Sequence, residues 1–288
     1  MSSIRNARER LSPRPFLKWA GGKSELLAEI LGELPQGPLE LYVEPFLGGG
    51  AVFFELVRLG RVKRAVLGDR NPELVDAWRA VQADPLPLIA AFGAWEKDEA
   101  TYYKVRALDP RGLDAVRRAA RVLYLNRLGF NGLYRLNSKG GFNVPYGRSK
   151  SPPRIDRDNL LAVHQALQGV MFVEGDFDDV LAKATPGATV YCDPPYWPLS
   201  QTASFSCYDG MVFGRADQER LAATFRGLPA RGICGVLSNA DVPETRALYD
   251  GLPFRTVWCR RFINSRSDRR GHVAELVVRT GAELPASR

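Results

Sequence analysis

The sequence contains no long apolar run. Its 288 residues include no stretch of about 20 consecutive apolar residues, the length that a membrane-spanning helix needs. The first segment, Met1–Arg14, is polar and basic and lacks the apolar centre of a secretion signal. We therefore expect no membrane association and a location in the cytosol, with residues 1–14 forming a flexible tail.

Cysteine and histidine are also scarce. The four cysteines are widely spaced, and two of them lie in apolar, strand-like runs; they are Cys192, Cys207, Cys234 and Cys259. The two histidines, His164 and His272, are far apart and lack metal-ligand spacing. This usage is typical of reduced, cytosolic thiols. We therefore expect neither a disulfide framework nor a metal site, and we interpret His164 as a structural residue on a helix.

Two nucleotide-binding fingerprints are incomplete. The run Gly22–Ser24 imitates the end of a phosphate-binding loop, but Leu17 occupies the place of that motif's first glycine, and no clear strand precedes it. ATP binding of that kind is therefore excluded. Gly48 and Gly50 likewise begin a dinucleotide fingerprint whose third glycine position holds Phe53. This residue argues against a nucleotide-dependent oxidoreductase.

Positive charge, by contrast, is abundant and localised. The chain carries a net charge of +8. Between residues 104 and 158 there are thirteen Lys or Arg residues and only four acidic ones, all Asp, so this block alone carries +9. A basic block of this kind is the usual electrostatic footprint of nucleic-acid binding. Charge alone leaves a solvated basic face as an equal alternative.

Short apolar strands alternate with helical patterns over most of the chain. The predicted strands are Leu41–Glu44, Arg64–Leu67, Val170–Glu174, Thr189–Cys192, Ile233–Ser238, Phe254–Phe262 and Val273–Arg279. This alternation predicts an α/β fold with a doubly wound, mainly parallel sheet, and the last two strands can form an antiparallel hairpin at its edge. Residues 84–168 read as a largely helical insertion. We therefore expect a catalytic, cofactor-binding domain over 15–83 and 169–288, and a target-recognition domain over 84–168.

The first strand leads into a glycine turn and a helix. Gly48, Gly49 and Gly50 separate Leu41–Glu44 from a predicted helix at 51–59, and the start of a helix favours an anionic group. Asp69 follows the second strand, 20 residues beyond Gly49, where an acid is placed to bind ribose hydroxyls. The pattern predicts a nucleotide-like cofactor, with a plain tight turn as the alternative.

The chemically most specific stretch follows the strand Thr189–Cys192. Asp193 stands at the carboxyl end of that strand, and Pro194 and Pro195 stop the sheet ladder and stiffen the turn that presents Tyr196. The Asp193 carboxylate and the Pro194 carbonyl can together hold both hydrogens of an amine, while the Tyr196 ring can stack on a planar base. The alternative is an ordinary turn with a tyrosine in the core. A long polar and aromatic loop, 198–216, follows and is of a length that usually serves function.

Two extended runs inside the basic block predict a β-hairpin. They are Phe130–Leu136 and Phe142–Tyr146, joined by a turn that contains Gly140 and Gly141. The hairpin carries polar side chains suited to base edges in a major groove, where Arg reads guanine and Asn reads adenine. These are Asn131, Tyr134, Arg135, Asn137 and Asn143. A solvated hairpin packed on the helices is the alternative.

Taken together, these motifs are similar to one family. The chain resembles the Dam-type, D12 class, DNA adenine-N6 methyltransferases over nearly its whole length and in the family's order. The segments that carry the resemblance are Phe16–Lys23, Glu44–Gly50, Leu123–Leu133, Phe142–Arg148, Val190–Tyr196 and Leu237–Asn239. The resemblance implies a Rossmann-like methyltransferase fold, S-adenosyl-L-methionine as the cofactor and double-stranded DNA as the substrate.

The resemblance also implies roles for particular positions. Cofactor contact is implied for Trp19, Lys23, Asp69 and Asp193, and we assign to the same site Glu44, Phe46, Gly48, Asp176 and Phe177. The grip on a flipped adenine is implied for Asp193, Pro194, Pro195 and Tyr196. DNA contact is implied for Lys18, Leu133, Arg135 and Pro145, with GATC as the target, and we add Asn131, Asn143 and Arg148 from the hairpin. Ser149 replaces an aromatic residue that some members carry.

Several alternatives stay open on the sequence. The same amine chemistry suits RNA, cytosine N4 or a glutamine side chain, and a DNA-binding module without catalysis is a further reading. The chain is expected to be a monomer, acting alone or paired with a restriction endonuclease. Cys192 is interpreted as a packing residue, because direct methyl transfer to an amine needs no thiol nucleophile.

Overall fold

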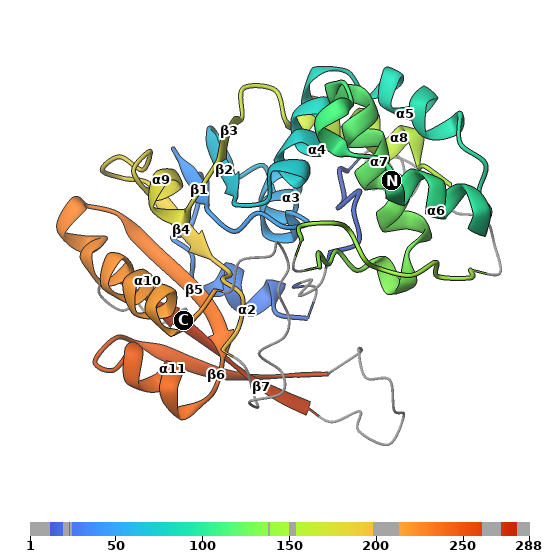
Figure 1. Ribbon diagram of the computed structural model, residues 1–288. Helices are drawn as coiled ribbons and strands as arrows, with labels where there is room; N and C mark the ends of the chain where they lie inside the picture. The colour runs from blue at the N-terminus through green and yellow to red at the C-terminus, as the bar shows by residue number, and fades with distance from the viewer. Residues whose placement is uncertain are drawn as a thin grey trace.

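The computed structural model describes residues 12–19, 23, 25–137, 139–149, 154–197, 213–260 and 272–280 (Figure 1). The strands are β1 (Tyr42–Glu44), β2 (Ala65–Asp69), β3 (Met171–Glu174), β4 (Thr189–Cys192), β5 (Cys234–Ala240), β6 (Phe254–Arg260) and β7 (His272–Arg279). The helices are α2 (Leu27–Glu33), α3 (Ala51–Arg58), α4 (Pro72–Ala83), α5 (Pro85–Gly93), α6 (Glu99–Ala107), α7 (Ala115–Leu128), α8 (Arg157–Ala166), α9 (Phe177–Leu181), α10 (Arg215–Gly227) and α11 (Pro243–Leu248).

The strands form one seven-stranded sheet in the order β3-β2-β1-β4-β5-β7-β6. Strands β3, β2, β1, β4 and β5 are parallel to one another, and β7 is antiparallel to β5 and β6. The mainly parallel, doubly wound fold and the terminal antiparallel pair are therefore confirmed. The strand order reverses between β1 and β4, and in open α/β sheets ligands bind outside the carboxyl ends of the strands at such a point.

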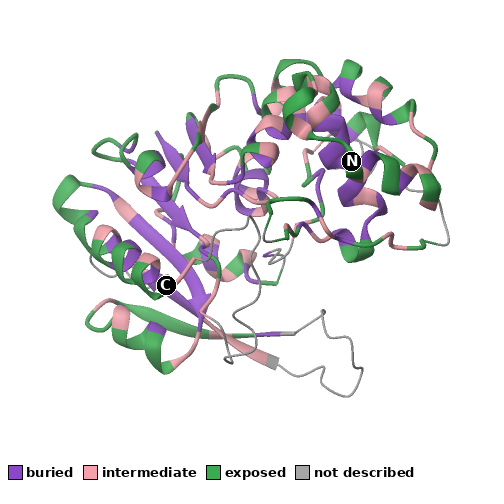
Figure 2. Cartoon of the chain, viewed as in Figure 1, coloured by how far each residue is buried: buried purple, intermediate pink, exposed green. Residues whose placement is uncertain are grey.

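Each strand contributes to two hydrophobic cores because successive side chains point to opposite faces. Tyr42 of β1 and Tyr191 of β4 belong to the core that α3, α4 and the helices of residues 84–168 cover. Val43 and Val190, one position away, belong to the core that α9 and α10 cover. The residues of the central strands are coloured as buried in Figure 2. Burial on both faces explains why these strands read as continuous apolar runs in the sequence.

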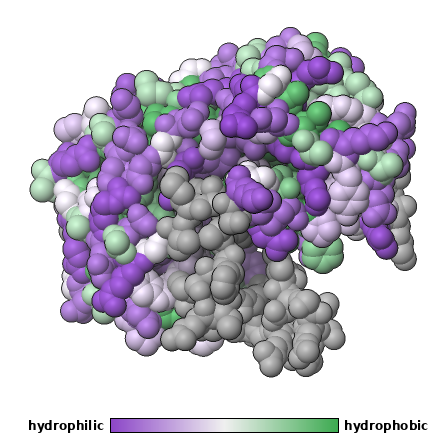
Figure 3. Space-filling model, viewed as in Figure 1, coloured by the Kyte–Doolittle hydropathy of each residue, from purple (hydrophilic) through white to green (hydrophobic). Residues whose placement is uncertain are grey.

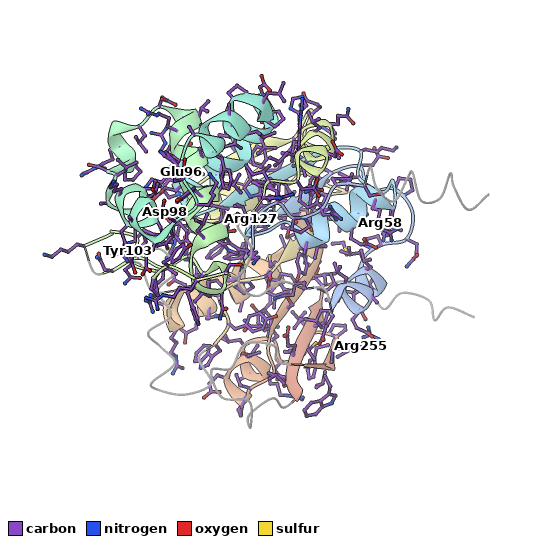
Figure 4. The ribbon with its side chains drawn as sticks, turned by 90° about the vertical axis from the view of Figure 1, so that its right-hand side faces the viewer. Arg58, Glu96, Asp98, Tyr103, Arg127 and Arg255 are labelled. Carbon is purple, nitrogen blue, oxygen red and sulfur yellow. The ribbon has the colours of Figure 1, made fainter. Side chains whose placement is uncertain are left out.

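The helices of residues 84–168 gather at one end of the sheet, at the upper right of Figure 1. An aspartate caps four of them: the side chains of Asp84, Asp98, Asp114 and Asp156 each accept a backbone N–H from the first turn of the helix that follows. Arg127 of α7 donates to the Phe16 carbonyl at 2.8 Å and ties this region to the N-terminal segment (Figure 4). The helical region also shares a hydrophobic core with the sheet.

At the other end of the sheet, β6 is the edge strand. Arg255 of β6 pairs with Glu29 of α2 and, through Nε, with Glu33 of the same helix at 2.8 Å (Figure 4). These ion pairs connect the antiparallel strands at the end of the chain to the first helix described. Within the described residues, no helix has both the length and the apolar character needed to cross a membrane.

The structure corrects the predicted β-hairpin. Residues 130–132 form a 3₁₀ turn, and the two runs meet only at the isolated bridges Gly129–Tyr146 and Leu136–Phe142. Asn131 and Gly132 have φ values of 55° and 66°, which a strand does not accommodate, and Pro145 has no N–H for a ladder. The segment is therefore a loop of two limbs, and we call residues 129–148 the recognition loop.

The expected flexible tail is also adjusted. Arg14 was expected in a flexible tail, but its backbone N–H donates to Asn159 and its side chain pairs with Asp156. Residues 1–11 of the predicted tail and 198–212 of the predicted long loop lie outside the described residues.

Candidate active site

Acidic and polar residues line one edge of the sheet. Each parallel strand ends with, or is followed closely by, one of them: Asp176 after β3, Asp69 on β2, Glu44 on β1, Asp193 after β4 and Asn239 on β5. The strands are parallel and adjacent, so their carboxyl ends meet at the same edge. The sequence motifs that follow separate strands are thus brought into one row, which is centred on the point where the strand order reverses.

Asp193 lies at the centre of this row. The ammonium of Lys23 lies 2.9 Å from its Oδ1, and the Ser238 hydroxyl donates to the same oxygen at 3.1 Å. The Tyr191 hydroxyl lies 2.8 Å from Ser238 Oγ in the core beneath. Burial raises the pKa of Asp193, while the charge and the hydrogen bonds of Lys23 and Ser238 oppose that rise. The site therefore contains a desolvated carboxylate held in place by two donors.

Tyr196 is fixed at both its ring and its hydroxyl. The Lys23 ammonium lies 4.6 Å from the centre of the ring, and the hydroxyl donates to Oε2 of Glu275 on β7. Burial raises the pKa of Glu275 as well as that of Tyr196. These contacts fix the plane of an aromatic ring beside the Asp193 carboxylate.

A side chain of α10 is hydrogen-bonded to the turn between Asp193 and Tyr196. The Gln218 side chain donates to the Pro195 carbonyl at 2.8 Å and accepts a hydrogen bond from the Asn239 amide at 3.1 Å. Asn239 in turn accepts the Trp197 N–H at 3.3 Å. Gln218 and Asn239 are both buried, so this polar network is satisfied internally and keeps the turn in one conformation.

The glycine turn packs under Trp19. Gly48 has a φ of +48°, and a Cβ built on it would lie 2.7 Å from Cδ1 of Trp19, so only glycine fits. Asp69 accepts the Gly48 N–H at 3.0 Å and the Asn71 N–H at 3.0 Å. The acid at the end of β2 is thereby joined to the glycine turn, a contact that the sequence did not predict.

Glu44 is a buried acid beneath this turn. Its side chain accepts a hydrogen bond from the Tyr42 hydroxyl at 2.9 Å, and the residue is 2% exposed. Desolvation is the main cause that raises the pKa of Glu44 to about 8, and the charges of Asp193 and Asp69 add to it. Burial therefore favours the protonated, neutral form of Glu44 near neutral pH.

Aromatic rings and an arginine surround Asp176. Phe177 lies 5.7 Å from Phe46 and 6.0 Å from Phe213, measured between ring centres. The Arg220 guanidinium lies 4.2 Å from the centre of the Phe177 ring and donates to both oxygens of Asp176, at 2.6 and 2.8 Å. This bidentate pair lowers the pKa of Asp176. The arrangement offers flat apolar faces beside an ionised acid.

The recognition loop alternates buried and exposed residues. Tyr134, Phe142 and Val144 are buried against the helical region. The residues between them, including Asn131, Arg135 and Pro145, are exposed, and Leu133 and Asn143 are half-buried. Arg135 Nε donates to Asn143 Oδ1 at 2.7 Å, so these two predicted base contacts lie together on opposite limbs.

Lys18 lies against the same loop. A Cβ on Gly132 would be 2.6 Å from the Cβ of Lys18, and the Asn126 amide donates to the carbonyl oxygens of both residues. Arg148 is exposed at the far end of the loop and its guanidinium lies 3.4 Å from Glu99 of α6, so it is not drawn into the Arg135–Asn143 pair. Figure 3 shows hydrophilic side chains over most of the face seen there.

Several residues near the site were not identified from the sequence. Glu275, Gln218 and Arg220 lie on elements distant in sequence from the motifs they support, and only their pairing with Tyr196, Pro195 and Asp176 reveals them. Phe130 was assigned to a strand, but the residue is 49% exposed beside Asn131. An exposed aromatic residue in a basic segment is a candidate for DNA contact, because such rings can stack on or insert between bases.

The prediction for Cys192 is confirmed. Cys192 is fully buried in the core on the α9 and α10 side, and burial raises the pKa of its thiol. A thiol in that environment is a poor nucleophile, because the reactive form is the thiolate.

Comparison with known proteins identifies a family that the chain matches. The model of the family described as D12 class N6 adenine-specific DNA methyltransferase matches residues 19–261 of the chain. Among solved structures, one described as precorrin 8W decarboxylase from Methanobacterium thermoautotrophicum matches 94% of this chain and 99% of that chain, at 15% identity and a TM-score of 0.40. Both the sequence identity and the TM-score of this match are low.

Curated relatives are similar over almost their entire length. The Type II methyltransferase M1.LlaDCHI of Lactococcus lactis subsp. cremoris is 36% identical over 94% of this chain and 96% of its own. The DNA adenine methylase of Escherichia coli strain K12 is 37% identical over 96% of this chain and 99% of its own. The Type II methyltransferase M.MjaIII of Methanocaldococcus jannaschii is 39% identical over 89% and 95%, respectively.

Proposed function

The chain belongs to the D12 class of N6 adenine-specific DNA methyltransferases, and from this we propose that it transfers a methyl group from S-adenosyl-L-methionine to a flipped adenine in GATC. The observation that supports the proposal most directly is the cluster of Lys23, Asp193 and Tyr196 at the sheet's reversal point. It combines a carboxylate acceptor with a fixed aromatic face, the two features that hold a planar base by its amine.

The described residues fit S-adenosyl-L-methionine. Asp69 offers a carboxylate for ribose hydroxyls, the rings of Phe46 and Phe177 offer flat faces for an adenine, and the Lys23 ammonium suits a carboxylate. Gly48 keeps the turn open where a Cβ would collide with Trp19. We assign to the same site Trp19, Glu44, Asp176 and Asp193. When bound, the cofactor supplies an electrophilic methyl group on a sulfonium.

The chain's own residues then position and polarise the target amine. Adenine N6 is hidden in a duplex, so the base must be flipped out at a cost of a few kcal/mol. Stacking on Tyr196 and hydrogen bonds to Asp193 and the Pro194 carbonyl offset that cost. Lys23 and Ser238 both approach Oδ1 of Asp193, and we assign Oδ2 to the amine. These hydrogen bonds hold the amine hydrogens out of the ring plane, so the lone pair is localised on N6 instead of being delocalised into the ring. The carboxylate also stabilises the positive charge that develops on N6 during methyl transfer.

Sequence recognition is assigned to the recognition loop together with Lys18. Arg135 suits a guanine and Asn143 an adenine, and their hydrogen bond places both groups at the exposed end of the loop. Leu133 and Pro145 supply apolar contacts, while Asn131 and Arg148 are further candidates for DNA contact. Residues 84–168 would thus act as the target-recognition part, and 15–83 with 169–288 as the catalytic part.

The biological setting is a further part of the proposal. Two of the similar proteins are named Type II methyltransferases, and on that basis pairing with a restriction endonuclease is one setting for this chain. Another is that of a solitary methylase. We propose that it acts as a monomer on double-stranded DNA in the cytosol, where the reduced state of its cysteines is maintained.

The proposed function is tested by mapping modified bases. Plasmid DNA from a methylation-deficient host that expresses the chain is read by long-read sequencing, with Asp193→Ala as the control that removes the amine acceptor. N6-methyladenine in GATC with the wild type, and none with Asp193→Ala, is the expected result. The same mark in another motif would overturn only the GATC assignment. A mark on cytosine N4, on RNA, or on no nucleic acid at all would overturn the proposed activity.

A further inference from the structure

Tyr134 reaches from the recognition loop toward the cofactor side of the molecule. The residue is 5% exposed, although Arg135 beside it is on the surface. The Tyr134 ring lies 5.4 Å from the Trp19 ring and 5.4 Å from the Phe142 ring. Its hydroxyl donates to Glu73 at 3.1 Å. Tyr134 is therefore held at its ring, which we call its face, and at its hydroxyl, which we call its tip.

The tip of Tyr134 is anchored to two helices. Glu73 lies in the first turn of α4, which begins at the Asn71 cap, and the Asn71 N–H donates to Asp69. The other oxygen of Glu73 accepts a bond from Arg121 of α7 at 2.7 Å. Arg121 is 2% exposed and also donates to two carbonyl oxygens of α6. Buried, hydrogen-bonded charges of this kind hold one geometry, because losing a partner is costly.

The face of Tyr134 is anchored through Trp19 to the glycine turn. The Trp19 ring covers Gly48 so closely that a Cβ there would collide with it, and the Gly48 N–H is bonded to Asp69. Lys18, the residue before Trp19, lies against Gly132 of the recognition loop. The segment that packs on the cofactor side is thus the same one that packs on the loop.

We propose that Tyr134 is a positioning residue that couples the cofactor site to the recognition loop. Both of its anchors lead to the hydrogen-bonded pair Gly48 and Asp69: Trp19 packs on Gly48, and Glu73 lies in the helix whose cap residue donates to Asp69. A ligand that fixes Trp19 and Asp69 therefore fixes Tyr134, and with it the placement of Leu133 and Arg135. By linkage, DNA that fixes the loop tightens cofactor binding by the same factor. This inference rests on the proposed function, because it takes one site to hold the cofactor and the other to read DNA.

The test measures the affinity for S-adenosylhomocysteine by calorimetry, with and without a GATC duplex. The ratio of the two dissociation constants is expected to be about fivefold or more in the wild type, the range found for coupled sites. Tyr134→Phe removes only the hydroxyl that reaches Glu73, and we expect its ratio to fall below about twofold while its affinity without DNA stays near wild type. Tyr249→Phe is the matched control: Tyr249 is fully buried in the other core, and within the described chain its hydroxyl has no hydrogen-bond partner.

The outcomes separate the inference from the proposed function. A wild-type ratio of one, or an unchanged ratio in Tyr134→Phe, overturns the coupling role even if the same preparation methylates DNA. A lower melting temperature with an unchanged ratio gives Tyr134 a purely structural role and also overturns it. If the wild type methylates no DNA, the proposed function fails, and the inference fails with it. A ratio lost in Tyr134→Phe and kept in Tyr249→Phe supports it.

Discussion

The ammonium of Lys23 lies 2.9 Å from Oδ1 of Asp193, although the helical residues 84–168 separate the two in the sequence. The Asp193 side chain is 19% exposed and that of Lys23 only 7%. Burial raises the pKa of Asp193, and Lys23 is the largest influence that opposes the rise. The ion pair therefore controls how much of the carboxylate is ionised and able to accept a hydrogen bond from an amine.

Replacing Ser238 should shift the pH dependence of the reaction. Ser238→Ala removes a hydrogen bond that lowers the pKa of Asp193, so the carboxylate should protonate at a higher pH. The acid limb of kcat/KM against pH is expected to move upward, so that activity is lost more at pH 6 than at pH 8. Tyr191→Phe serves as the control, because it leaves the Ser238 hydroxyl on Asp193. An unmoved limb in Ser238→Ala would show that Asp193 does not set the profile.

Neutralising Glu44 should make the protein more stable at alkaline pH. In the unfolded chain Glu44 loses its proton near pH 4.3, but in the folded protein it keeps the proton up to about pH 8. Between these values the folded state binds more protons, so wild-type stability falls as the pH rises. Glu44→Gln has no proton to lose at this position. The difference between its free energy of unfolding and that of the wild type should therefore grow with pH in this range, by at most on the order of 1 kcal/mol per pH unit.

Urea unfolding at pH 5.5, 7 and 8.5 measures this gain. Glu55→Gln is the comparison, because Arg58 lowers the pKa of Glu55. Its contribution to stability is present above the ordinary pKa of glutamate and is lost only as the pH falls below it. Between pH 5.5 and 8.5 the difference in stability between Glu55→Gln and the wild type should therefore stay constant, while the difference for Glu44→Gln grows as the pH rises. Parallel curves would mean that Glu44 is ionised in the folded protein.

Removing Arg135 should relax the choice of one base. Arg135→Ala takes away the bidentate donor assigned to a guanine, and we expect a loss of about 1–3 kcal/mol in discrimination at that position. Arg117→Ala removes an equal charge from the exposed face of α7, so it should weaken binding evenly across sequences. Methylation rates on duplexes with single-base changes provide the measurement. An unchanged preference in Arg135→Ala would exclude Arg135 as a base reader.

Removing Arg220 should weaken cofactor binding more than catalysis. Arg220 is paired with Asp176, Asp178 and Asp217 and covers Phe177. In Arg220→Ala the three carboxylates repel one another, and we expect the cofactor dissociation constant to rise about fivefold to tenfold, which is about 1 kcal/mol. The value of kcat at saturating cofactor should stay within about twofold of wild type, because binding and not the reacting groups is disturbed.

The same variant should lose stability in a pH-dependent way. Arg220 lowers the pKa of Asp176, so its contribution is present at neutral pH and lost as Asp176 protonates in acid. We expect a loss of about 1 kcal/mol in unfolding free energy near pH 7 and none at low pH. Arg215→Ala on the same helix breaks a highly exposed pair with Glu219 and should change neither quantity. An equal effect of both variants would reduce Arg220 to a surface charge.

What could be predicted from the sequence was local. The strands at residues 42–44 and 189–192 and the glycine turn before α3 follow from apolar runs, glycine and proline. The position of Asp193 at the end of a strand follows as well, because chain neighbours and the two-residue period of a strand determine it. Parallel pairing then brings Glu44, Asp69 and Asp193 to one edge. The fold class and the centre of the candidate site could accordingly be predicted.

What the sequence could not determine depends on contacts between distant segments. Lys23 on Asp193, Glu275 on Tyr196 and Arg220 on Asp176 pair residues whose spacing carries no signal, since only the packed sheet and helices bring them together. The predicted hairpin was wrong because the left-handed backbone at Asn131 and the burial of Tyr134 and Phe142 bend its limbs onto the helices. The sequence by itself determined which candidate groups stand at the ends of the strands. The tertiary structure decided which distant side chains hold them, because those contacts form only when the core packs.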